Sequence, residues 1–239
     1  MTVERAAVLD QVAVALDTHD RATFERWCSF FGPRVGVLKV GLEAFVRWGP
    51  PAIETARRHA RRLFLDLKLH DIPNTVAGAV RSAREFEVDY LTIHAAGGPA
   101  MIAAAAEAAG DKLALLAVTV LTHLDEATLE LLDLPGGSAR RALGWAHLAR
   151  AAGAAGVVSS PLELPALRAA EPRPFLLVAP GIRPAGSAGG DDQRRTATAE
   201  AAIASGADLL VIGRPLTQAV DPEKALAELA RELGGNMPA

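Results

Sequence analysis

The sequence of 239 residues is poor in cysteine, lysine and tyrosine, and it has no long uninterrupted apolar run. Cys28 is its only cysteine, so the chain can form no intrachain disulfide and no cysteine-based metal site. Cys28 is predicted to be a small buried residue of a helix. No apolar segment approaches the roughly 18 residues that cross a bilayer, and the first ten residues lack the features of a signal peptide. A cytoplasmic location with no membrane partner is therefore expected.

An excess of charge of one sign is also lacking, because the formal net charge is −3 and the pI is about 6.1. Binding to a nucleic-acid backbone needs clustered excess lysine and arginine, so nucleic acid is not an expected partner. Any phosphate group must be held by a local site. Half of the residues are hydrophobic and 22% are charged, which predicts an ordinary globular protein with a single domain over residues 1–239.

Lysine is used sparingly, because only four of the 25 basic residues are lysines. Two of them, Lys39 and Lys68, end apolar runs that have the character of strands, where a solvated surface charge is least expected. Their positions suggest chemistry, because a lysine can give up a proton whereas an arginine cannot.

Short apolar runs rich in valine, leucine and isoleucine alternate with helix-like segments along the whole chain. Eight such runs are predicted to be strands: Val12–Leu16, Val35–Val40, Leu63–Leu67, Tyr90–His94, Leu113–Thr119, Gly156–Ser159, Phe175–Ala179 and Leu209–Ile212. Continuous apolar strands are typical of a parallel sheet covered on both faces. The pattern predicts an α/β fold, a closed (β/α)8 TIM barrel, with an open doubly wound sheet as the alternative.

The last helix has the clearest end signals. Asp221 is its expected N-cap, Pro222 its first residue and Gly234 the residue just past its end. The longest irregular stretch follows the seventh strand, over about 180–195, and is predicted to be a flexible functional loop on the phosphate side of the barrel.

Polar residues at the carboxyl ends of barrel strands point to a common mouth. The candidates are Asp17, Lys39, Asp66, Lys68, His94, Thr119, Thr122, Gly213 and Arg214. Residues two apart face the same side of a strand, so Asp66 and Lys68 should project together, and Asp71 follows in the turn. These residues with Lys39 predict either a catalytic network of alternating charges or a structural ion-pair network.

Gly213 and Arg214 directly follow the eighth apolar run, where barrels often bind phosphate. Glycine allows close backbone approach and arginine can fork onto phosphate oxygens, with Gln193 and Arg195 approaching from the preceding loop. The alternative is a tight turn beside a solvated arginine. A metal site built from His70, His94 and nearby carboxylates is disfavoured, because two lysines would compete for those carboxylates.

The segment DLKLHDIPNT, from Asp66 to Thr75, strongly resembles the signature of the orotidine 5'-phosphate decarboxylases. Further blocks agree in order: VALD ending at Asp17, LKVG with Lys39, TIHAAGG after the fourth run, AVTVLT ending at Thr122, APGIR ending at Arg183, DDQRR with Gln193 and VIGRP with Gly213 and Arg214. The resemblance covers almost the whole chain. One departure is Thr198-Ala199, where family members commonly carry Thr-Pro.

The resemblance implies conversion of orotidine 5'-phosphate into uridine 5'-phosphate and CO2, with no metal or organic cofactor. It implies that Lys68 protonates C6 of the pyrimidine, within a network of Lys39, Asp66 and Asp71. It also implies a homodimer in which Asp71 and Thr75 reach the partner's active site. The remaining implied substrate contacts are Asp17 and Lys39 with the ribose, Thr122 with the pyrimidine, and Arg183, Gln193, Gly213 and Arg214 with the phosphate.

Two other functions remain open at this point. A magnesium-dependent sugar-phosphate lyase of the same suprafamily shares the Asp-x-Lys-x-x-Asp spacing but typically carries an acidic residue where this chain has Lys39. A catalytically silent barrel that only binds nucleotides or protein partners would need none of the five charged residues Asp17, Lys39, Asp66, Lys68 and Asp71.

Overall fold

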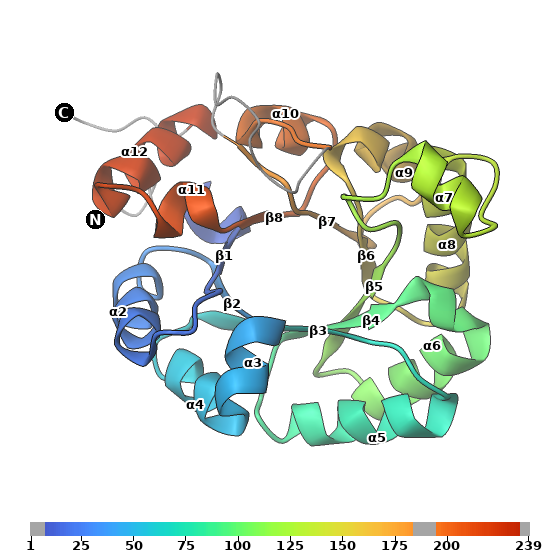
Figure 1. The fold of residues 1–239 in the computed structure, drawn as a ribbon, viewed down its shortest axis with the longest axis horizontal. Coiled ribbons are helices and arrows are strands. Elements are labelled where there is room, and N and C mark those ends of the chain that lie inside the picture. Colours follow the sequence, from blue (N-terminus) through green and yellow to red (C-terminus); the bar gives the residue numbers. More distant parts are fainter. Residues whose placement is uncertain (1–7, 184–194, 235–239) are drawn as a thin grey trace.

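Eight parallel strands close into a barrel in the order in which they occur along the chain. The computed structural model describes residues 8–183 and 195–234, and Figure 1 looks along the barrel with the strands around its centre. The strands are β1 (Val12–Ala15), β2 (Val37–Gly41), β3 (Arg62–Leu69), β4 (Tyr90–His94), β5 (Ala114–Val118), β6 (Gly156–Val158), β7 (Leu176–Ala179) and β8 (Leu209–Ile212). The predicted (β/α)8 barrel is confirmed. The open doubly wound sheet is wrong, because β1 pairs with β8.

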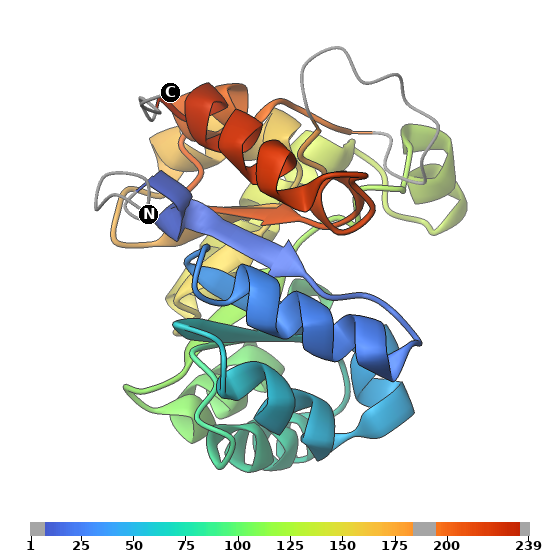
Figure 2. The same ribbon diagram turned by 90° about the vertical axis from the view of Figure 1, so that its left-hand side faces the viewer.

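Helices form a ring outside the strands, as Figures 1 and 2 show. In Figure 2, α2 and α12 lie on either side of β1. The α-helices are α2 (Arg21–Phe31), α3 (Leu42–Trp48), α4 (Pro50–Arg57), α5 (Pro73–Arg84), α6 (Gly98–Ala109), α7 (Glu126–Leu131), α8 (Ser138–Ala151), α9 (Leu164–Ala170), α10 (Ala199–Ala204), α11 (Arg214–Thr217) and α12 (Pro222–Glu232). Short 3-10 turns are η1 (Leu9–Gln11), η2 (Ala95–Gly97) and η3 (Pro161–Glu163).

The strands are apolar on both faces because both faces are covered. One set of strand residues packs beneath the helices in the main core, and the alternate residues fill the barrel interior as a second cluster. That inner cluster consists of Ala13, Val37, Phe64, Leu116, Val178 and Leu209. Interior residues further along the strands are no longer uniformly apolar, so polar groups can gather at the carboxyl ends.

The ends of the helices follow the sequence signals. Asp221 accepts a hydrogen bond from the backbone N–H of Lys224 at 3.0 Å and so caps α12, while Gly234, just past its end, has a φ of +85°. The departure at Ala199 has a structural use, since the backbone N–H of Ala199 donates to Glu232 Oε1 of α12 at 2.7 Å. A proline in this position has no N–H to donate.

Cys28 is fully buried in α2, as predicted, and burial raises the pKa of its thiol to about 12. Most of the loop predicted over 180–195 lies outside the described residues, and so does Gln193. None of the helices within the described ranges is long and apolar enough to cross a membrane.

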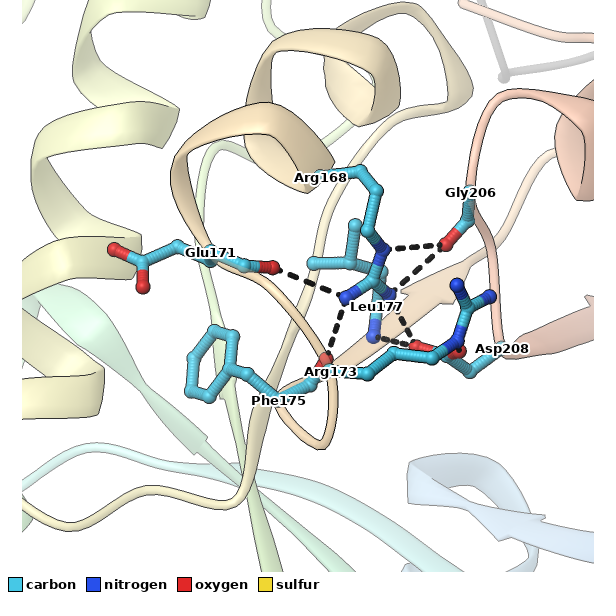
Figure 3. Close-up of polar contacts among 7 residues, drawn as sticks. All are labelled: Arg168, Glu171, Arg173, Phe175, Leu177, Gly206 and Asp208. Carbon is cyan, nitrogen blue, oxygen red and sulfur yellow. Dashed lines mark hydrogen bonds and ion pairs between the residues drawn. The ribbon is translucent and has the colours of Figure 1, made fainter.

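Two similar charged clasps stabilise the amino-terminal end of the barrel. In the first, Figure 3 shows the Arg168 guanidinium bonded to Asp208 and to the carbonyl oxygens of Gly206, Glu171 and Phe175. Asp208 also accepts the backbone N–H of Leu177 at 2.8 Å. Helix α9 is thereby tied to the starts of β7 and β8.

The second clasp repeats this pattern at β3 and β4. Arg57, at the end of α4, donates to Asp89 at 2.9 Å and to three nearby carbonyl oxygens. Asp89 accepts the backbone N–H of Leu63 at 2.7 Å, as Asp208 does with Leu177. The Arg57–Asp89 side chains are 30% and 37% exposed, against 16% and 15% for Arg168–Asp208, so water screens the second clasp more strongly.

We expect alanine substitutions to rank the two clasps by burial. Asp208→Ala should lower the free energy of unfolding by about 3 kcal/mol, because it leaves a largely buried guanidinium without its partner. Asp10→Ala, which removes an exposed pair with Arg61, should cost less than about 1 kcal/mol, and Asp89→Ala should lie between them. Denaturant unfolding would measure the series. Equal losses in all three variants would contradict a role for burial.

Candidate active site

A cavity of about 620 Å³ opens at the carboxyl ends of the strands. Eight of the predicted site residues line it: Asp17, Lys39, Asp66, Lys68, Thr122, Arg183, Gly213 and Arg214. The convergence of strand ends therefore brings together most of the predicted site, although these residues are far apart in the sequence.

Four charged side chains, Asp17, Lys39, Asp66 and Lys68, alternate in sign at the base of this cavity. Lys39 Nζ lies 3.1 Å from Asp66 Oδ2, and Lys68 Nζ lies 2.8 Å from Asp66 Oδ1. Lys39 Nζ also lies 3.7 Å from Asp17 Oδ1. The carboxylate of Asp66 therefore stands between two ammonium groups, one from β2 and one from its own strand.

Burial and neighbouring charges shift the pKa values of Asp66 and Lys39 in opposite directions. Burial alone would raise the pKa of Asp66, but the ammonium groups of Lys39 and Lys68 hold that pKa well below its ordinary value of 3.8. Burial alone would lower the pKa of Lys39, but Asp66 and Asp17 raise it above 10.5. Asp66 is therefore an anion and Lys39 a cation across the physiological pH range.

Gly41, at the end of β2, makes room for this arrangement. A Cβ atom at position 41 would lie 2.3 Å from Asp17 Oδ1 and 3.0 Å from Lys39 Nζ. Any side chain there would displace the Asp17 carboxylate or the Lys39 ammonium. The glycine of the LKVG block is thus required by close approach.

Lys68 reaches Asp66, but simple strand alternation does not explain how. The register of β3 and β4 shifts between Leu65 and Leu69, and Lys68 has a φ of +50°. A left-handed backbone is unfavourable for a residue with a side chain, and such strain concentrates at functional sites. The meeting of Asp66 and Lys68 is confirmed, and it depends on a strand irregularity that the sequence pattern does not reveal.

Asp71 and Thr75 do not join the cavity of their own chain. Both side chains are exposed, and within the described part of the chain Asp71 accepts a local hydrogen bond, from the backbone N–H of Ile72 at 2.6 Å. Asp71 lines a separate shallow depression with His70 and Pro73. The residues that lead into α5 and its first turn therefore keep these two side chains out of the cavity.

His70 and His94 stack on each other. Their ring centroids lie 5.2 Å apart, and His94 Nδ1 accepts the backbone N–H of Ala96 at 3.2 Å. Burial, His70 and Lys68 together lower the pKa of His94. Over residues 8–183 and 195–234, no three His, Cys, Asp or Glu side chains are grouped so as to hold a metal ion.

The family of the chain follows from comparison with known proteins. Residues 10–229 match the model of the "Orotidine 5'-phosphate decarboxylase / HUMPS family". The chain belongs to this family. The match spans the barrel from η1 into α12 and includes the charged residues Asp17, Lys39, Asp66 and Lys68.

Several curated relatives carry the decarboxylase half of that family name. The orotidine 5'-phosphate decarboxylase of Thermobifida fusca is 52% identical over 93% of this chain and 95% of its own length. That of an Anaeromyxobacter species is 49% identical over 94% and 98%. A crystal structure of the Lactobacillus acidophilus decarboxylase has a TM-score of 0.80 at 34% identity, covering 93% of this chain and 98% of its own.

Within this family fold, Arg195 does not take the position expected from the sequence. Its guanidinium is directed at Glu163 Oε1 and at the carbonyl oxygens of Leu121, at 3.0 Å, and Val120, at 3.3 Å. These contacts contradict the interpretation of Arg195 as a phosphate donor, because both terminal nitrogens are bonded to Glu163 or to the loop after β5 and Arg195 does not line the cavity. It ties the segment before α10 to the residues that precede Thr122.

Glu163 is a buried residue that sequence reasoning missed. Its side chain is 3% exposed, and Oε2 accepts a hydrogen bond from Ser159 at 3.2 Å. Burial raises the pKa of Glu163 above 4.5, an effect that Arg195 and Ser159 partly offset. Only its position two residues after Pro161 in a short 3-10 turn could have drawn attention to it, and that signal is weak.

We expect Arg195→Met to destabilise the protein in a pH-dependent way. Without the guanidinium, the pKa of Glu163 in the folded state should rise further above 4.5, so the folded chain holds a proton that the unfolded chain releases. The deficit relative to the wild type should be smallest near pH 4.5, where it reflects the lost bonds to the carbonyls of Val120 and Leu121, and should grow by about 3 kcal/mol at pH 8. Denaturant unfolding at both pH values measures this difference.

The double variant Arg195→Met with Glu163→Gln provides the control, since it removes the buried charge together with its partner. It should lose the pH dependence and recover part of the stability. A deficit in Arg195→Met that is the same at both pH values would show that the ion pair is not its cause.

Proposed function

We propose that the chain catalyses the cofactor-independent decarboxylation of orotidine 5'-phosphate to uridine 5'-phosphate and CO2, a step of pyrimidine biosynthesis. The alternation of Lys39, Asp66 and Lys68 at the base of the cavity carries this proposal. Family membership and the names of relatives about 50% identical support it independently.

Lys68 is the acid in the proposed reaction. The bond between C6 of the pyrimidine and its carboxylate breaks, CO2 leaves, and the electron pair stays on C6. The Lys68 ammonium gives a proton to C6, which forms uridine 5'-phosphate, and the neutral amine regains a proton from solvent. The step consumes one proton and needs no oxidant or reductant.

The charge arrangement suits that step. Negative charge develops at C6, and an ammonium group already fixed by Asp66 at 2.8 Å stabilises it without reorganisation. Asp66 lies next to Lys68, so the departing carboxylate occupies a position near another anion. Lys39, held between Asp17 and Asp66, balances the charge.

The remaining cavity residues divide the substrate among them. Asp17 and Lys39 bind the ribose hydroxyls, and Thr122 contacts the pyrimidine. Arg183, Gly213 and Arg214, with Gln193 from outside the described residues, hold the phosphate. For the described residues, the shared position around one cavity supports this assignment. Binding energy from the distant phosphate can be used to stabilise the transition state at C6.

Purified protein in EDTA should turn over orotidine 5'-phosphate, as followed by loss of its absorbance. Lys68→Ala should lower kcat at least about a hundredfold, because it removes the proton donor. Lys112→Ala is the matched control, since Lys112 is exposed and lies before β5 at the other end of the barrel.

Each result has a definite meaning. An inactive wild type, or a Lys68→Ala variant as active as Lys112→Ala, would contradict the proposal. Activity that appears only with added magnesium would favour the sugar-phosphate lyase, and binding without turnover would favour the silent barrel. A cytoplasmic location and a single domain over 1–239 stay predictions.

We further propose a homodimer in which Asp71 and Thr75 complete the partner's active site. Two observations support this: both side chains are exposed and absent from their own cavity, and the neighbouring Ile72 is 66% exposed although it is a large apolar residue. An exposed isoleucine beside polar side chains that do not line the cavity of their own chain is typical of a protein interface.

Mixing two inactive variants tests the shared site. In a dimer of Lys68→Ala with Asp71→Ala, one site contains both changes, and the other contains neither if Asp71 serves the partner. Random reassortment should then restore about a quarter of wild-type activity, since half the dimers are mixed and each has one intact site. No recovery, with reassortment verified by differently tagged chains, would contradict the proposal.

A further inference from the structure

Thr92, in the middle of β4, is a buried polar residue that the proposed reaction does not yet use. Its side chain is completely buried and is not among the groups that line the cavity. It lies on the inner face of the barrel, next to Asp66. A buried hydroxyl needs hydrogen-bond partners among the neighbouring groups, so those partners indicate which residues Thr92 acts on.

The Thr92 hydroxyl has one partner on each side of its oxygen. The backbone N–H of Lys68 donates to Oγ1 at 2.9 Å, and Oγ1 lies 2.8 Å from Asp66 Oδ1. A backbone N–H can only donate and an ionised carboxylate can only accept. The hydroxyl proton of Thr92 therefore points to Asp66, and the direction of both hydrogen bonds is fixed.

The register of the barrel explains why a side chain takes this role. Leu65 of β3 pairs with Leu91 of β4, and the next pair is Leu69 with Ile93. Three residues of β3 thus face the single residue Thr92. The regular backbone ladder cannot serve all three, and the Thr92 hydroxyl satisfies the N–H of Lys68 in its place.

The same contact holds Lys68 in an unfavourable conformation. A φ of +50° is costly for a residue other than glycine and persists only where the surroundings enforce it. The hydrogen bond from the Lys68 N–H to Thr92 fixes this backbone, while the bond from Thr92 to Asp66 fixes the carboxylate that receives the Lys68 ammonium at 2.8 Å.

We propose that Thr92 is a positioning residue for decarboxylation: its hydroxyl fixes the backbone of Lys68 and the carboxylate of Asp66 together, and so sets where the proton donor stands relative to C6. This inference rests on the proposed function. Thr92 does not line the cavity, so it acts on the reaction only through its two neighbours.

Thr92→Val removes the hydroxyl and keeps the shape of the side chain, whereas Thr92→Ser keeps the hydroxyl. We expect kcat for orotidine 5'-phosphate to fall about 10- to 100-fold in Thr92→Val, the range for losing a hydrogen bond to a charged group. The KM, and the inhibition constant of uridine 5'-phosphate, should change less than about twofold. Thr92→Ser should recover most of kcat.

Thr55→Val is the matched control. Thr55 is another buried threonine, 2% exposed, whose hydroxyl bonds within α4 and to nearby arginines, outside the cavity. It should lose stability without a change in kcat. If Thr92→Val does not fold, Thr92→Ala replaces it, with the same comparison to Thr92→Ser.

Three results would overturn the inference: an unchanged kcat in Thr92→Val, a kcat in Thr92→Ser as low as in Thr92→Val, or a loss that appears only in KM. These outcomes are distinct from failure of the proposed function, which an inactive wild type would reveal. An active wild type with an unaffected Thr92→Val variant removes only the role of Thr92.

Discussion

The arrangement of the active site depends on one buried carboxylate. Asp66 receives the ammonium groups of Lys39 and Lys68 and the hydroxyl of Thr92, so a single side chain connects β2, β3 and β4. A buried charge is costly unless it is paired and hydrogen-bonded. Here the two ammonium groups and the Thr92 hydroxyl together offset the cost of burying the Asp66 carboxylate. Each member depends on the others, because removing Asp66 would leave two cations facing each other beside the cavity.

The two ends of the barrel use similar chemistry for different purposes. At the amino-terminal end, Arg168–Asp208 and Arg57–Asp89 tie helices to strand starts and satisfy backbone groups. These arginines are surrounded by carbonyl oxygens and have no adjoining catalytic groups. At the carboxyl end, Lys39 and Lys68 pair with the carboxylate of Asp66 and border an open cavity. Substitutions in the two clasps therefore need not disturb the chemistry at the opposite end of the barrel.

Much of this could be predicted from the sequence, because the relevant patterns are local. The apolar runs indicated all eight strands, and polar residues at their ends indicated the cavity. Other features depend on contacts between distant segments. The spacing of Asp66 and Lys68 predicted their meeting, but not the register shift or the left-handed Lys68. Arg195 was misplaced because its partner Glu163 lies 32 residues away, and Thr92 has the sequence context of an ordinary strand residue.

The ionisation of Asp66 in the folded protein is the most direct test of the central claim, that this carboxylate is a permanent anion between two cations. Carboxyl carbon NMR of aspartate-labelled protein, with the signal assigned from its loss in Asp66→Asn, would follow it as the pH is lowered. The expected result is an Asp66 signal that stays ionised through its ordinary pKa of 3.8 for as long as the protein is folded. A titration midpoint at or above 3.8 in the folded state would contradict the claim.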